Sequence, residues 1–170
     1  EKDRLRLQQR IEGRYRDRAK LLKKNDQKVQ TLQTIFDEIL PSARVLIYGD
    51  DLNHLDELGK ELDRMGKYYF KYTGELDAQK ERPTILKEFR QGIRKILLAV
   101  GCLDEGIDIP ACDVAVFISS STSERQFIQR RGRVLRIAPG KTTAWIYDYL
   151  VYPILPASTS DEERRMALSV

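Results

Sequence analysis

Two neighbouring groups of residues between positions 129 and 143 could bind a phosphate. The first is an arginine cluster formed by Arg130, Arg131, Arg133 and Arg136. The second is Gly140-Lys141-Thr142, which matches the end of a nucleotide-binding loop. A guanidinium group donates two hydrogen bonds to phosphate oxygens, whereas a Gly-Lys-Thr loop holds them with backbone N–H groups and an ammonium group. The residues around each group decide between these two chemistries.

The Gly140-Lys141-Thr142 segment lacks the rest of a nucleotide-binding loop. The pattern G-x-x-x-x-G-K-[ST] requires a first glycine at position 135, where this chain has Leu135. That loop also follows a strand and begins a helix, whereas here a predicted helix comes before and a predicted strand after. With Pro139, the segment is typical of a turn. The sequence therefore argues against a stand-alone P-loop nucleotide hydrolase.

The arginine cluster has a regular spacing. If residues 123–134 form a helix, Gln129, Arg130 and Arg133 lie on one face, and Arg136 continues that face beyond the helix end. Guanidinium groups without an acid between them repel one another, and a bound anion would relieve this repulsion. Gly132, inside the predicted helix, lowers helix propensity and suggests close approach of another backbone. The alternative is a set of surface arginines paired with acids elsewhere.

The elements that position these residues alternate along the chain. Short apolar runs predict strands at 44–50, 67–74, 94–100, 113–121 and 143–151. Amphipathic spacing predicts helices at 25–40, 52–66, 76–92 and 123–134. Strands that are apolar on both faces and alternate with helices predict a mostly parallel sheet flanked by helices, hence a three-layer α/β domain. Ligands of such sheets bind at the carboxyl ends of the strands.

Composition suggests three parts. Residues 1–24 carry ten Lys and Arg against four acids, a net of +6 in a chain whose total is +4. We expect 1–24 to be a basic helix or linker that either binds nucleic acid or is simply solvated, 25–155 to be the α/β domain, and 156–170 to be a tail or the start of another helix. The chain begins within a charged run and without an initiator Met, which indicates a fragment of a longer protein.

Several other kinds of site are not supported. No apolar run is long enough to span a membrane, and no signal-peptide pattern is present, so we expect a cytoplasmic location, or a nuclear one in a eukaryote. Cys102 and Cys112 are too few for a metal cage and are predicted to be buried thiols. His54 stands in a polar helix start, and we assign it no catalytic role.

Four segments, in order along residues 44–151, resemble the motifs of superfamily 2 helicases. VLIYGDD (45–51) resembles motif IV, VGCLDEGIDIP (100–110) resembles motif V, and QFIQRRGRVLR (126–136) resembles motif VI, Q-x-x-G-R-x-x-R. YTGELDAQKERPTILKEFRQG (72–92) is similar to the segment between motifs IV and V. The combination is most similar to DNA helicases of the xeroderma pigmentosum B type and their prokaryotic and phage relatives. Gln129 stands where DEAD-box RNA helicases usually have His.

The resemblance implies the C-terminal RecA-like lobe of a two-lobe, ATP-driven DNA helicase or translocase. ATP and Mg²⁺ would be held mainly by an N-terminal lobe outside this chain. By motif position, the catalytic arginine fingers would be Arg133 and Arg136. The residues that support the nucleotide would be Gly106, Asp108, Gln129 and Arg130.

The resemblance also implies a nucleic-acid interface at the strand ends. Its residues would be Gly49, Thr73, Gly74, Arg90, Val100 and Gly101. Contacts of this kind are made to phosphates through backbone N–H groups and small side chains, so they are independent of sequence and sensitive to salt. Motif V often begins with Thr or Ser, whereas this chain has Val100, which leaves the contact to the backbone of Gly101 or weakens it.

The partners implied are DNA, either single-stranded or duplex, the N-terminal lobe of the same protein, and other subunits of a repair, transcription or defence complex. The alternative function is a RecA-like module that binds nucleic acid or protein without hydrolysing ATP. The two differ in whether a Gly-Lys-Thr loop and an Asp-Glu pair precede this chain in its parent protein.

Overall fold

The computed structural model describes residues 29, 31–77, 79–100, 112–118, 128, 131–132, 134–136, 141–149 and 160–162. The chain divides into two compact units, one made of residues 24–149 and the other of residues 1–23 with 150–170. In the second unit, only 160–162 are described, and residues 161 and 162 are helical. The domain boundaries expected at 24/25 and 155/156 remain predictions.

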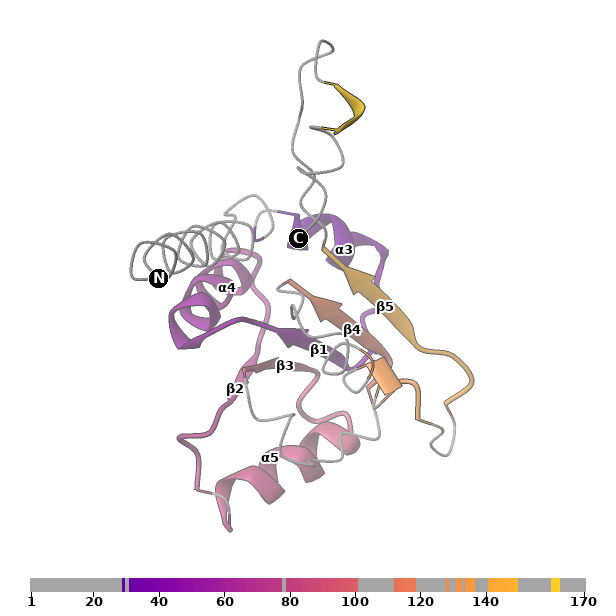
Figure 1. Ribbon diagram of the computed structural model, residues 1–170. Helices are drawn as coiled ribbons and strands as arrows, with labels where there is room; N and C mark the ends of the chain where they lie inside the picture. The colour runs from indigo at the N-terminus through magenta and orange to yellow at the C-terminus, as the bar shows by residue number, and fades with distance from the viewer. Residues whose placement is uncertain are drawn as a thin grey trace, which may run out of the picture. The chain divides into compact units, whose positions relative to one another are not determined.

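A five-stranded sheet forms the centre of the 24–149 unit (Figure 1). The strands are β1 (Val45–Tyr48), β2 (Phe70–Tyr72), β3 (Ile96–Ala99), β4 (Val114–Phe117) and β5 (Trp145–Asp148). Their order is β2-β3-β1-β4-β5, and every neighbouring pair is parallel. Each strand lies inside a range predicted from the sequence, and the parallel sheet is confirmed.

Three helices of this unit are described completely. They are α3 (Leu32–Glu38), α4 (Leu52–Arg64) and α5 (Glu81–Arg90). Helix α4 is followed by Gly66 and α5 by Gly92, both with positive φ (63° and 72°), a conformation that glycine adopts without the steric cost of a side chain. Pro83, which lies in the first half of the predicted helix, falls in the first turn of the observed one, where its missing N–H removes no helical hydrogen bond. No described helix is long and apolar enough to cross a membrane.

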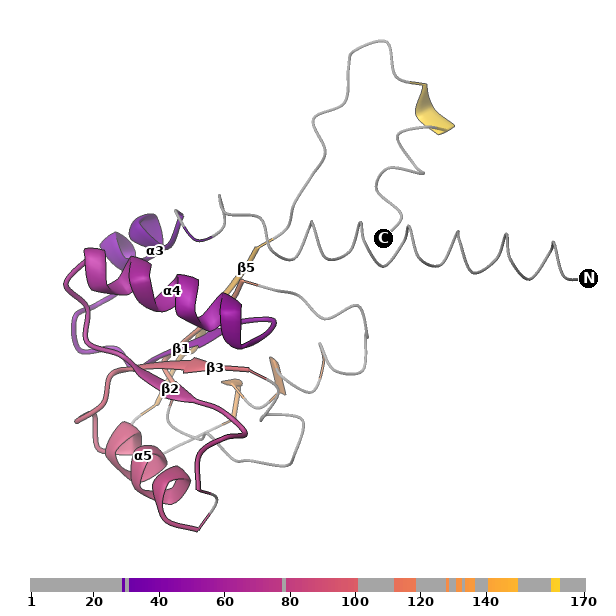
Figure 2. The ribbon, with the colours of Figure 1, turned by 90° about the vertical axis from the view of Figure 1, so that its left-hand side faces the viewer.

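Side chains of the central strands alternate between two cores. Val45 and Ile47 of β1 pack with α3 and α4, whereas Leu46 and Tyr48 pack with α5. Figure 2 shows α3 and α4 on one side of the sheet and α5 on the other. All four residues of β1, β3 and β4 are buried, because helices cover both faces. The three-layer α/β domain predicted from the sequence is confirmed.

The strand order places a topological switch point between β1 and β4. The chain leaves β1 through α4 on one face, whereas Val134, in the connection that follows β4, packs in the core on the other face. Because crossovers are right-handed, two connections that run in opposite directions along the sheet lie on opposite faces of it. Ligands of open parallel sheets bind beyond the carboxyl ends of the strands at such a point.

One expectation about packing is wrong, and the described residues give no support to a second. An aromatic residue inside a predicted strand such as 143–151 is expected in the core, yet the side chain of Trp145 is 65% exposed because it begins β5, which is the last strand of the described sheet. Gly132 was expected to allow close approach of another backbone. A Cβ added there would meet no atom within 4 Å among the described residues, so this part of the chain does not itself require the glycine.

Candidate functional site at the carboxyl edge of the sheet

The loop after β1 is fixed by hydrogen bonds around a buried histidine. The Gly49 N–H donates to the Ala99 carbonyl (3.0 Å), which joins this loop to the end of β3. The Asp51 carboxylate caps α4 by accepting the His54 backbone N–H (2.9 Å), and the Asp50 N–H donates to His54 Nδ1 (3.2 Å). His54 is 1% exposed, so it is a structural residue of this loop, which the polar sequence around it did not indicate.

Gly49 packs closely against α4. A Cβ added at Gly49 would stand 2.8 Å from Leu55 Cδ2, below any normal contact distance. Leu55 is fully buried and has little room to move. The motif glycine therefore has a packing role in the chain, whatever else it contacts.

The loop after β2 brings together two of the predicted nucleic-acid residues. Thr73 directly follows β2 and is buried, and Gly74 comes next and is exposed. The Gly74 carbonyl accepts a hydrogen bond from Arg82 Nη2 (2.8 Å). Arg82 lies in the first turn of α5, so this end of the helix is at the carboxyl edge. Sequence reasoning missed Arg82, although a helix that follows a strand must begin near that strand's carboxyl end.

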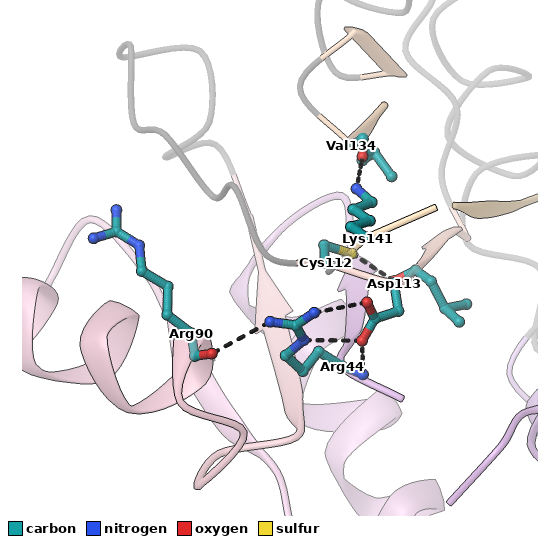
Figure 3. A network of polar contacts seen from close by, with 7 residues as sticks. Arg44, Arg90, Cys112, Asp113, Val134 and Lys141 are labelled. Carbon is teal, nitrogen blue, oxygen red and sulfur yellow. Dashed lines mark hydrogen bonds and ion pairs between the residues drawn. The ribbon is translucent and has the colours of Figure 1, made fainter. Parts of the chain in front are cut away.

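The structure places Arg90 at the other end of α5, apart from these loops. Its backbone carbonyl accepts a hydrogen bond from Arg44 Nη1 (3.2 Å), and Arg44 precedes β1 at the amino edge of the sheet (Figure 3). Eight residues of helix separate it from Arg82, or ~12 Å along the axis. Arg90 is therefore not brought together with Thr73 and Gly74.

Motif V begins at the end of β3, and its described part is Val100. Val100 follows β3 and packs, half-buried, against the core on the α3 and α4 side. Three predicted site residues of this motif lie outside the described residues, namely Gly101, Gly106 and Asp108.

Two arginines of the cluster, Arg131 and Arg136, lie in the described part of the chain. Arg131 forms an ion pair with Asp148, the last residue of β5, as the surface-pairing alternative expected for members of the cluster. Val134 is buried in the core on the α5 side, while Arg136 is exposed. Gln129, Arg130 and Arg133 lie outside the described residues.

The described part of the Gly140-Lys141-Thr142 segment, Lys141 and Thr142, does not have the structure of a nucleotide-binding loop. Lys141 and Thr142 lead into β5 without forming a helix, and the Lys141 ammonium donates to the Val134 carbonyl at the end of the preceding helical stretch (Figure 3). A basic side chain at a helix C-terminus satisfies a carbonyl that has no partner within the helix. Lys141 therefore has a structural role.

Arg44 and Asp113 form a bidentate ion pair at the amino edge of the sheet, near Lys141. Arg44 donates from Nη2 and Nε to the two carboxylate oxygens of Asp113, at 2.8 and 2.9 Å, and its backbone N–H adds a third bond (Figure 3). Partial burial alone would raise the pKa of the Asp113 carboxyl, but the hydrogen bonds and charge of Arg44 outweigh burial and lower this pKa. Burial raises the pKa of the neighbouring Cys112 thiol to about 12, so it stays protonated, as expected of a buried thiol; Cys102 lies outside the described residues.

A five-stranded parallel sheet with helices on both faces is the architecture of a RecA-like α/β domain. The family of the helicase conserved C-terminal domain matches residues 27–138. The chain therefore belongs to the C-terminal domains of superfamily 2 helicases.

Relatives from the curated proteins differ in what their names say they act on. The chain is 26% identical over 161 residues to a putative ATP-dependent RNA helicase of Methanocaldococcus jannaschii, a match that covers 88% of this chain and 19% of the relative. It is 41% identical over 56 residues to the DNA 3'-5' translocase XPB2 of Sulfurisphaera tokodaii (33% of this chain, 13% of the relative). It is 47% identical over 58 residues to Dicer-like protein 2-1 of Aspergillus niger (34% and 4%). The chain thus spans less than a fifth of each of these proteins.

Solved structures show the same fold. The helicase domain of Hef from Pyrococcus furiosus is similar with a TM-score of 0.56 and 27% identity, over 83% of this chain and 28% of that one. The C-terminal domain of the DEAD-box protein Dbp5 has a TM-score of 0.62 at 24% identity, over 76% of this chain and 73% of that one.

Proposed function

We propose that this chain is the C-terminal motor lobe of an ATP-dependent DNA helicase or translocase. It would supply arginine fingers to an ATP site shared with an N-terminal lobe, together with a face that binds nucleic acid. The observation that carries the proposal is the family match over residues 27–138, which includes every residue assigned to the site. ATP and Mg²⁺ would be held mainly by the N-terminal lobe.

Arg133 and Arg136 are the proposed arginine fingers. A guanidinium group placed against the γ-phosphate neutralises charge that develops as the phosphoryl group transfers, and such fingers accelerate hydrolysis by about 10³–10⁵-fold in other systems. Support comes from Arg136, which is exposed at the end of a helical stretch anchored by buried Val134. Further support comes from Gly132, because no described residue lies within 4 Å of a Cβ added there and a nucleotide could approach its backbone.

The remaining nucleotide contacts follow motif position. We assign Gln129 and Arg130 to the same cleft, Asp108 to the ribose or to a Mg²⁺-bound water, and Gly106 to close approach of the backbone to the nucleotide. Hinge closure of the two lobes would couple hydrolysis to stepping.

The decisive experiment measures ATP hydrolysis by the full-length protein in the presence of DNA. We expect Arg136→Ala to reduce kcat by at least ~100-fold with the fold intact, because it removes charge stabilisation of the transition state. Arg64→Ala is the matched control, since Arg64 is an exposed arginine paired with Glu61 on the surface of α4. Equal activity of Arg136→Ala and Arg64→Ala would refute the role of Arg136. Robust ATP hydrolysis by the 170-residue chain alone would refute the shared site.

The nucleic-acid face consists of the loops that contain Gly49, Thr73 and Gly74 and of the segment Val100-Gly101. These loops follow β1, β2 and β3, which are neighbours in the sheet, so one strand of nucleic acid could cross them all. We add Arg82, whose guanidinium lies against Gly74, and we leave out Arg90, which is at the opposite end of α5.

Arg82 and Arg90 form a matched pair of variants on one helix. Arg82→Gln removes the charge but keeps a hydrogen-bond donor for Gly74. We expect it to weaken DNA binding uniformly across sequences and to lower the slope of log K against log salt by about one. Arg90→Gln should leave both unchanged. If Arg90→Gln had the larger effect in a salt titration, the proposed interface would be on the wrong edge.

DNA is proposed as the substrate because Gln129 takes the place of the His usual in DEAD-box RNA helicases, and because the motifs resemble those of helicases of the xeroderma pigmentosum B type. The test compares how strongly DNA and RNA of the same sequence stimulate ATP hydrolysis by the full-length protein. Stronger stimulation by RNA would assign the motor to RNA instead.

A further inference from the structure

An apolar groove of about 380 Å³ opens at the amino edge of the sheet, where β1, β2 and β3 begin. Its rim carries three large side chains that are mostly in water, Leu40 (73% exposed), Tyr68 (88%) and Ile93 (68%). Each stands in the segment that leads into one of these strands. None of the residues that line the groove belongs to the carboxyl-edge loops or to residues 131–136.

The floor of the groove is continuous with the core. Val45 and Ile96, the first residues of β1 and β3, and Phe36 of α3 form part of it. Two of these side chains, Val45 and Ile96, are buried in the core cluster on the α3 and α4 side. A ligand that fills the groove would therefore meet an apolar surface that is part of the core. Contiguous exposed apolar surface of this kind marks interaction sites.

The charged residues that line the groove are all basic. They are Lys67 and Lys95, and no carboxylate is among the described lining residues. Lys67 Nζ lies 5.5 Å from the centroid of the Phe36 ring, and Lys95 Nζ donates to the Pro41 carbonyl (3.2 Å). Within the part of the chain that the structure describes, neither ammonium group forms an ion pair with a carboxylate. Each ammonium group has three donors, so both retain donors for a ligand.

Two carboxylates near this edge already have basic partners. Asp113 is held by Arg44, and Glu88 forms an ion pair with Arg94, whose guanidinium also stacks 3.5 Å above the Phe70 ring. The two lysines therefore give the groove a positive potential that these acids do not cancel. A complementary ligand must be apolar along one face and acidic beside it.

We propose that this groove docks an amphipathic helix of a partner protein, with an apolar stripe in the groove and Asp or Glu residues against Lys67 and Lys95. A small molecule inside the groove would leave Leu40, Tyr68 and Ile93 in water, whereas a helix with apolar residues at i, i+3 or i+4, and i+7 covers all three. The partner would bind while the carboxyl edge stays accessible. The inference uses only the amino edge and does not depend on the proposed function.

A library experiment tests the proposal on the full-length protein. The probe is a displayed library of amphipathic helices with fixed leucines at i, i+4 and i+7 and random residues at the flanking positions. Binders are selected on the wild-type protein and counter-selected on a Leu40→Ser/Ile93→Ser variant. We expect the selected helices to be enriched in Asp and Glu at the flanking positions and to bind the double variant at least about tenfold more weakly, as loss of central apolar anchors does elsewhere.

Exchanging the charges of the groove and the helix tests whether Lys67 and Lys95 recognise the acidic residues of the helix. Lys67→Glu/Lys95→Glu should weaken a selected acidic helix about tenfold, and the same helix with its Glu residues changed to Lys should bind this variant more tightly than it binds the wild type. The matched control is Leu52→Ser, an exposed leucine at the start of α4 outside the groove, and binding should be unchanged. Circular dichroism and DNA-stimulated ATP hydrolysis check that each variant is folded.

Three results would overturn the proposal. The first is selected helices without acidic enrichment. The second is selected helices that bind the Leu40→Ser/Ile93→Ser variant as well as the wild type. The third is a dimer of the full-length protein in sedimentation that becomes monomeric in that variant, since the groove would then be an interface between copies of the chain.

Discussion

Replacing Gly132 by alanine should make the protein more stable. A Cβ at this position meets no atom within 4 Å among the described residues, and Gly132 does not have the positive φ that would strain an alanine. Alanine is favoured over glycine inside a helix by about 0.8–1 kcal/mol, and Gly132 is near the end of its helical stretch, so we expect a gain of about 0.5–1 kcal/mol. For a chain of this length the melting temperature should rise by about 1–4 °C.

The same substitution should reduce ATP hydrolysis. If the nucleotide approaches the Gly132 backbone, the added methyl group collides with the ligand although the chain has room for it. We expect kcat/KM of the full-length protein to fall at least about tenfold while the free energy of unfolding, from urea titration, increases. Opposite changes in stability and activity separate a ligand contact from a folding defect.

Gly92→Ala is the matched control. Gly92 has φ of 72° and lies beyond α5, so alanine should destabilise the fold by about 1–2 kcal/mol, while the activity of the folded fraction is unchanged. Full activity of Gly132→Ala, together with higher stability, would refute the close approach of a nucleotide. Lower stability of Gly132→Ala would refute the open space around this glycine.

Two further substitutions test the packing and the amino-edge ion pair. Gly49→Ala should destabilise the fold by about 1–3 kcal/mol, because its methyl group overlaps Leu55. Leu55→Ala should reduce the free energy of unfolding by less in the Gly49→Ala background than in the wild type. If the two losses are additive in urea titrations, the overlap is excluded. Asp113→Asn should lower stability by about 1 kcal/mol at pH 7. The folded-state pKa of Asp113 is below its unfolded value of about 4, so its contribution is present above pH 4 and is lost as pH falls through the folded pKa. The difference between wild type and Asp113→Asn should therefore shrink in acid, and a constant difference would show that the charge of Asp113 is not involved.

Much of the layered fold could be predicted from local pattern. The continuous apolar runs of β1, β3 and β4 indicated strands buried on both faces, and the glycines at positions 66 and 92 marked two helix ends. The exclusion of a P-loop rested on Leu135 and on element order, and the structure agrees by placing Lys141 at a helix end. Local pattern suffices for these features because periodicity and turn chemistry depend on neighbours in sequence.

The candidate site was only partly predictable. Motif similarity selected Arg90, but the direction of α5 across the sheet brings Arg82 to the carboxyl edge instead. The polar residues around His54 gave no sign that its imidazole is buried and orders the loop after β1. The sequence did hold a signal for Arg82, since the first turn of a crossover helix lies near the end of the preceding strand.

By itself, the sequence determined the alternation of strands and helices, the family motifs and the absence of a complete P-loop pattern. Each of these features depends only on residues that are close together along the chain. The tertiary structure decided which side chains meet. It placed Trp145 at the sheet edge, joined Arg44 to Asp113 across 69 positions, and gathered Leu40, Tyr68 and Ile93 around one groove. The physical reason is that strand order and crossover direction are set by long-range burial, which short-range periodicity does not encode.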